Sequence, residues 1–178
     1  MRLIHCTQKL LKELDVTPVD LTSYTRDSEG LGNWYAHLIR IDKRKCILFT
    51  NEKTLYSFLI PQVVKSNLIN IKNEFIAHLV FNLQKDGFGI DVINMVRQEY
   101  GEIGFARTAN RSVIGSMNEF AFEYKFLIMR DGGIENTKIL EVNTKINQIP
   151  MKHNSKYLFP KEALKILIEG KSEHSTGN

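Results

Sequence analysis

A long segment with a single helical period, residues 107–133, constrains the fold of this chain most. Apolar side chains recur there at intervals of three and four residues, which is the spacing of one buried helix face. The members of that face are Val113, Met117, Phe120, Tyr124, Leu127 and Ile128. Thr108 or Asn110 suits the N-cap, and Gly132 and Gly133 suit the C-terminal end. The segment therefore predicts a central amphipathic helix.

Two aromatic residues interrupt the polar side of this helix. Phe122 and Phe126 are four residues apart, and helix residues at that spacing lie next to each other. Because Phe is usually buried, we expect the second half of the helix to be covered on two sides, by a sheet and by another helix. The alternative is an exposed aromatic pair that contacts a partner or a ligand.

The rest of the chain predicts an α+β fold with two layers, a mostly antiparallel sheet covered by helices. Strands are expected at residues 2–7, 34–41, 45–50, 55–60 and 139–147. Close spacing of the first runs favours an antiparallel meander. The last run has the clearest alternation, with Leu140, Val142, Thr144 and Ile146 opposite polar residues. Residues 103–107 predict a further strand that leads into the central helix.

Other helices and loops follow from periodicity and from Gly and Pro. Further helices are expected at residues 8–14, 64–84, 91–100 and 161–169, and Gly170 is expected to end the last one. The polar loop at residues 22–32 is expected to be mobile. We expect one globular domain over residues 1–170 and a disordered polar tail over residues 171–178.

Composition restricts the class of protein. Hydrophobic content is 43% and charged content 25%, as in ordinary globular proteins. The net charge of +4 permits anionic partners, nucleic acid included. Two cysteines, no signal-peptide pattern and no apolar run of membrane-spanning length indicate a cytoplasmic protein that has no membrane contact.

The familiar catalytic motifs are missing from the sequence. We find no G-x-S-x-G, no Walker loop, no H-E-x-x-H and no dinucleotide fingerprint after a strand. His5 and Cys6 are adjacent, which suggests a thiol with its base or part of a zinc site. However, neighbouring strand residues point to opposite faces of a sheet, so the two side chains are not expected to share a metal. No metal and no cofactor are expected.

The start of the central helix is the best candidate site. Free backbone N–H groups and the positive end of the helix dipole favour an anion there. The candidate ligand-binding residues are Arg107, Asn110, Arg111, Ser112 and Asn118. The alternative is an ordinary helix start, in which Asn110 or Thr108 caps the helix and the arginines pair with surface acids.

Two hypotheses about function follow. The first is a non-enzymatic binding or regulatory module for an anionic ligand, nucleic acid, a protein partner or a second copy of the chain. The second is an enzyme of unassigned class, in which Arg107 and Arg111 hold an anion, Glu119 acts as acid or base, and His5 lies nearby. The enzyme hypothesis requires these side chains to line one cleft and to include a group with a shifted pKa.

Four stretches, in order, resemble a family of small bacterial proteins known only as a domain of unknown function. They are RLIHCTQKLLKEL, GNWYAHLIRIDKRKCILFTNEKTLYSFLIP, RTANRSVIGSMNEFA and the late PKEAL. The family pattern has an opening LHCT, a DWYANL strand, an LFVN…TL hairpin and an NRSVLGSMND helix start. Asn33 and Glu119 stand where that pattern has Asp. The resemblance implies a bacterial, cytoplasmic protein, and it supplies no activity.

Overall fold

A mixed five-stranded sheet in the order β4-β3-β2-β1-β5 forms the centre of the protein. The computed structural model describes residues 1–23, 30–153 and 155–175, without the side chains of residues 171–175. The strands are β1 Arg2–Cys6, β2 Trp34–Ile41, β3 Arg44–Asn51, β4 Ser57–Ile60 and β5 Ile103–Arg107. β2, β3 and β4 form the expected antiparallel meander. β1 instead runs parallel to both β2 and β5, because α1 and a long connection intervene between β1 and β2.

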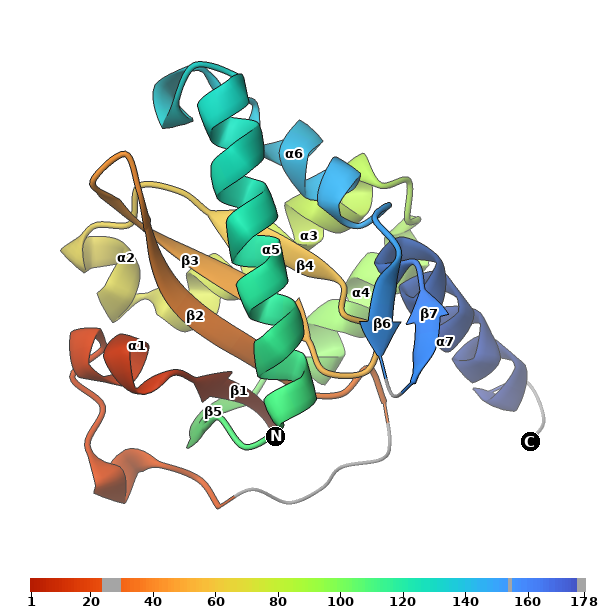
Figure 1. Ribbon diagram of the computed structural model, residues 1–178. Helices are drawn as coiled ribbons and strands as arrows, with labels where there is room; N and C mark the ends of the chain where they lie inside the picture. Colours follow the sequence, from red (N-terminus) through yellow and green to blue (C-terminus); the bar gives the residue numbers. More distant parts are fainter. Residues whose placement is uncertain (24–29, 154, 176–178) are drawn as a thin grey trace.

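Helices pack on both faces of this sheet. They are α1 Gln8–Glu13, α2 Lys65–Ile69, α3 Ile71–Lys85, α4 Ile90–Glu99, α5 Arg111–Arg130, α6 Ile139–Ile146 and α7 Pro160–Ser175. A small antiparallel hairpin, β6 Met151–His153 with β7 Lys156–Leu158, lies beside them. Figure 1 shows α5 across the front of the sheet and α3 and α4 behind it. The predicted central helix is thus confirmed, and Asn110 caps it.

Alternation along the strands divides the apolar residues into two cores. On β2, Trp34 and Leu38 face one core with residues of α1, α3, α4 and α7. Tyr35 and Ile39 face the other core with α5 and α6. The α+β class with a helix-covered sheet is therefore confirmed, and since helices cover both faces there is one layer more than the two expected.

The segment with the clearest two-residue alternation is a helix, so the strand predicted at residues 139–147 is wrong. The buried residues of α6 include Val142, Asn143 and Ile146, a helical spacing. Asn143 and the next buried residue in that series, Asn147, face the free edge of β4. The Asn147 carboxamide accepts a hydrogen bond from the Ser57 N–H and donates one to the Ser57 carbonyl, both at 2.7 Å. This tertiary pairing buries two polar residues and conceals the helical pattern in the sequence.

Asn143 completes the cover of the β4 edge. Its Oδ1 accepts hydrogen bonds from the Leu59 N–H at 3.1 Å and the Tyr124 hydroxyl at 2.7 Å. Its Nδ2 donates to Asn82 Oδ1 at 2.8 Å. An unpaired strand edge is a template for unwanted pairing, and here helix α6 protects it with side chains.

Three smaller expectations also need correction. The helix expected at residues 64–84 is divided at Asn70 into α2 and α3. α7 continues past Gly170 to Ser175, so that glycine does not end it. Phe122 and Phe126 are 69% and 48% exposed, so the aromatic pair is not covered on two sides. Most of the loop expected to be mobile, residues 24–29, and the end of the expected tail, residues 176–178, lie outside the described residues.

Candidate functional site

The carboxyl ends of β1 and β5 form the most distinctive place in the fold. These strands are parallel neighbours, and their last residues, Cys6 and Arg107, are paired in register. After β1 the chain enters α1, which packs in the Trp34 core. After β5 it enters α5, which packs on the opposite face. In open sheets, ligands bind in the crevice that forms where successive helices leave parallel strands toward opposite faces.

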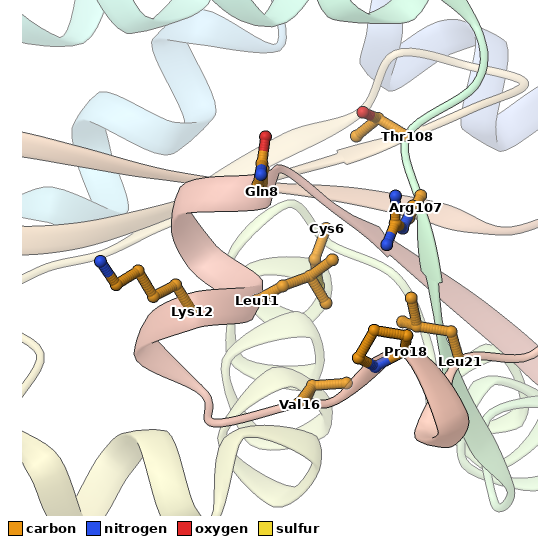
Figure 2. A pocket seen from close by; sticks show the side chains of 9 residues that line it. All are labelled: Cys6, Gln8, Leu11, Lys12, Val16, Pro18, Leu21, Arg107 and Thr108. Atoms are coloured by element: carbon orange, nitrogen blue, oxygen red, sulfur yellow. The ribbon is translucent and has the colours of Figure 1, made fainter.

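A pocket of about 430 Å³ occupies this position (Figure 2). It is lined by Cys6, Gln8, Leu11, Lys12, Val16, Pro18, Leu21, Arg107 and Thr108. Figure 2 shows Arg107 and Thr108 at the end of β5, with Gln8 and Leu11 across from them on α1. The Lys12 ammonium points away from Arg107 in that view, so Arg107 supplies the positive charge at this side of the pocket. A second hollow of about 320 Å³ shares Leu21, Arg107 and Thr108.

The loop between β5 and α5 is held in place from beneath by two buried rings. His5 Nδ1 lies 2.9 Å from the Arg107 carbonyl oxygen. The His5 ring stacks on Tyr35, with centroids 4.7 Å apart, and the Tyr35 hydroxyl accepts a hydrogen bond from the Asn110 N–H at 3.1 Å. Both rings are fully buried. Together they fix both ends of the segment that carries Arg107 and Thr108.

Burial sets the protonation states of the two titratable groups beneath the pocket. It lowers the pKa of His5, although the hydrogen bond with the Arg107 carbonyl acts in the opposite direction. A neutral imidazole that faces a carbonyl must carry its proton on the facing nitrogen, so Nδ1–H donates to Arg107. Burial raises the pKa of the Cys6 thiol, so this residue is protonated at neutral pH and is not a nucleophile.

The residues predicted from the sequence fall in three places. Arg107 lines the pocket, and His5 supports it from below. Asn110 uses its Oδ1 to cap α5, at 3.0 Å from the Ser112 N–H and 3.4 Å from the Val113 N–H. The remaining predicted residues, Arg111, Ser112, Asn118 and Glu119, are exposed along α5. In the described part of the chain, none of these four lines either pocket, so Glu119 and His5 do not share one cleft.

Sequence reasoning missed Gln8, Lys12 and Leu21 as pocket residues and Tyr35 as a support. The signal in the sequence that could have indicated the pocket is that polar residues directly follow two strands, β1 and β5. His5 and Cys6 do point to opposite faces, as expected: Cys6 lies in the core of α1, and His5 stacks on Tyr35 in the core of α5. Among the described residues, no group of three or more His, Cys, Asp or Glu is suited to a metal ion.

No helix within the described ranges combines the length and the apolar character needed to cross a membrane.

Comparison with known proteins gives one family. A family model described as Domain of unknown function (DUF6933) matches residues 3–163. A search among curated proteins finds no match. The matched range contains every residue that lines the pocket, from Cys6 to Thr108, and it includes α1, β5 and all of β1 except Arg2. Since the model covers most of its length, the chain belongs to the family Domain of unknown function (DUF6933).

Proposed function

We propose that the protein is a binding module for a small anionic molecule, held in the pocket at the carboxyl ends of β1 and β5. The observation that carries this proposal is the Arg107 side chain at the wall of that pocket. No ion pair to Arg107 occurs among the described residues. The lining described above also contains no acidic residue. A guanidinium that pairs with no carboxylate of the described residues favours an anion, which it can bind through two parallel hydrogen bonds.

The lining also favours a particular kind of molecule. Leu11, Val16, Pro18 and Leu21 give the pocket an apolar side, and Gln8 and Thr108 add an amide and a hydroxyl. Ligand pockets commonly combine apolar walls with a few fixed polar groups. We infer a ligand with one carboxylate or phosphate and an apolar body.

The start of α5 is a weaker candidate for the same anion. The Asn110 side chain already accepts hydrogen bonds from the N–H groups of Ser112 and Val113. These are two of the free N–H groups that an anion at a helix start would use. The proposal therefore places the anion at Arg107 and not at Arg111.

Matched pairs of small probes test the proposal by calorimetry. We expect phenyl phosphate and benzoate to bind more tightly than phenol and benzamide. Arg107→Gln is expected to weaken the anionic probes by about 10- to 100-fold, because a charge-assisted hydrogen bond contributes about 1.5–3 kcal/mol. Arg111→Gln is the matched control and is expected to leave binding unchanged.

The opposite outcomes are equally specific. Loss of binding in Arg111→Gln alone places the anion at the helix start. Equal binding of charged and uncharged probes removes the anion proposal. A short oligonucleotide that binds with steep salt dependence, where the small probes do not bind, points to nucleic acid as the ligand.

We also infer that the protein is bacterial and cytoplasmic. The bacterial origin is supported by the resemblance of the sequence segments. The compartment is supported by Cys6 and Cys46, which are free and buried on opposite faces of the sheet. Unpaired thiols are typical of reducing compartments.

A further inference from the structure

The outer side of α5 carries an apolar stripe. Phe122, Phe126 and Met129 are 69%, 48% and 69% exposed. Their spacing of four and three residues aligns them along one side of the helix. The opposite side, with Phe120 and Tyr124, is buried on the sheet. Large exposed apolar side chains in a contiguous row are typical of a protein interface.

Two opposite charges flank this stripe. Glu119 precedes it and Arg130 follows it, and both are exposed. They are eleven residues apart, which is about three helical turns, so both side chains lie on the same side of the helix. Arg130 is 3.0 Å from the carboxylate of its neighbour Asp131, in an exposed ion pair that contributes little to stability. The acidic end of the stripe thus points toward the start of α5 and the basic end toward its C-terminus.

This pattern is complementary to itself when reversed. In an antiparallel pair of α5 helices around a two-fold axis, Glu119 faces Arg130 of the partner subunit, and Arg130 faces Glu119 of the partner subunit. The same alignment places Phe122 beside Phe126 and Met129 of the partner subunit. A two-fold interface uses one patch twice, so the patch must match its own reversed copy.

We propose that the protein forms a homodimer through antiparallel contact of the α5 stripes. The partner is a second copy because Glu119 and Arg130, at the two ends of the stripe, complement each other in reversed order. The exposed Lys125, on the other flank of the stripe, lies near its own copy in this alignment, and the two end contacts and the apolar contact must offset that repulsion. An anionic membrane surface fits less well, since Glu119 and Glu123 lie beside the apolar residues. The contact involves one helix face from each copy, so we expect a reversible dimer with an interface at the small end of the known range.

Charge reversal gives a test that distinguishes this specific dimer from non-specific association of the exposed apolar residues. Glu119→Arg and Arg130→Glu each place like charges together twice in a homodimer. Mixed in equal amounts, one variant presents two basic residues and the other two acidic residues, so every contact is attractive again. We expect each variant alone to have a dissociation constant at least about tenfold weaker than the native protein, and the mixture to dimerise.

Sedimentation velocity from about 1 μM to 1 mM provides the measurement. Phe126→Ser is expected to give a monomer, whereas Phe81→Ser, an exposed Phe on α3, is the matched control and is expected to leave the dimer intact. Circular dichroism confirms that each variant is folded. A native protein that stays monomeric throughout, a charge variant that dimerises as tightly as the native protein, or failure of the mixture to associate would overturn the proposal.

Discussion

Replacing Asn147 with Leu removes the pairing that protects the edge of β4. Asn147 is fully buried, and its side chain bonds both backbone groups of Ser57, which is also fully buried. The substitution retains roughly the same volume but leaves the Ser57 N–H and carbonyl without partners. Each buried polar group without a partner costs about 1–3 kcal/mol. We therefore expect the free energy of unfolding to fall by about 2–6 kcal/mol, a large part of the stability of an ordinary domain.

Chemical and thermal denaturation measure this loss. For a chain of this size about 1 kcal/mol corresponds to about 2–4 °C, so the midpoint is expected to fall by about 4–24 °C. Asn94→Leu is the matched control, because Asn94 is exposed on α4 and exposed substitutions usually change stability by less than about 0.5 kcal/mol. An Asn147→Leu protein as stable as that control would refute the view that α6 side chains complete the sheet edge.

Three further predictions concern the core and the groups beneath the pocket. Because burial lowers the folded-state pKa of His5 below its unfolded value, the stability that neutral His5 contributes is fully present above a pH of about 6.5 and is lost as the pH falls. In pH-dependent denaturation the His5→Asn protein should therefore lose less stability than the native protein between pH 7 and 5, because the other histidines contribute equally to both proteins. Cys6 and Cys46 are buried with raised pKa, so a thiol reagent should label them at least about a hundredfold more slowly in the folded than in the denatured protein, and rapid labelling would contradict their burial. Phe75 packs against four aromatic rings at 5.1–5.9 Å, so Phe75→Ala should cost about 3–5 kcal/mol in urea denaturation, and a loss below 1 kcal/mol would show that the cluster is loosely packed.

Elements with local signals are the ones that the sequence predicts well. α5 is amphipathic over most of its length, and Asn110 caps it with its own side chain. The strands of the meander are bounded by short turns, which favour pairing between neighbours in sequence. These features depend on residues close together in the chain, and so their periodicity and capping are visible without the structure.

Features that depend on distant pairing are not visible in the sequence. α6 was expected as a strand because the burial of Asn143 and Asn147 has its cause on β4, 84 and 90 residues away. The candidate site also depends on distant pairing. The sequence indicates Arg107 only as a basic residue beside a helix start. Its approach to Gln8 requires β1 and β5 to be parallel neighbours, and the His5–Arg107 contact alone spans 102 residues. Strand order is set by the whole fold, and local patterns do not encode it.

The dependence on strand order also explains why the ligand residues predicted on α5 do not line the pocket. Arg111, Ser112 and Asn118 belong to a helix start that has the polar composition of an anion site. The pocket instead forms on the α1 side of β5, and these side chains are exposed on α5 and do not line it. Arg107 belongs both to the predicted anion site and to the observed pocket, because it is the last residue of β5 and lies between the two.

A nitrogen–proton NMR titration with phenyl phosphate locates the binding site directly. The account predicts that the backbone amide signals of Gln8, Leu21 and Thr108 shift on saturation, and that those of Ser112 and Asn118 do not, since the former line the pocket and the latter lie along α5. In Arg107→Gln the shifts should vanish at the same probe concentration. Shifts concentrated at Ser112 and its neighbours, with an unchanged response in Arg107→Gln, would contradict the assignment of the pocket as the anion site.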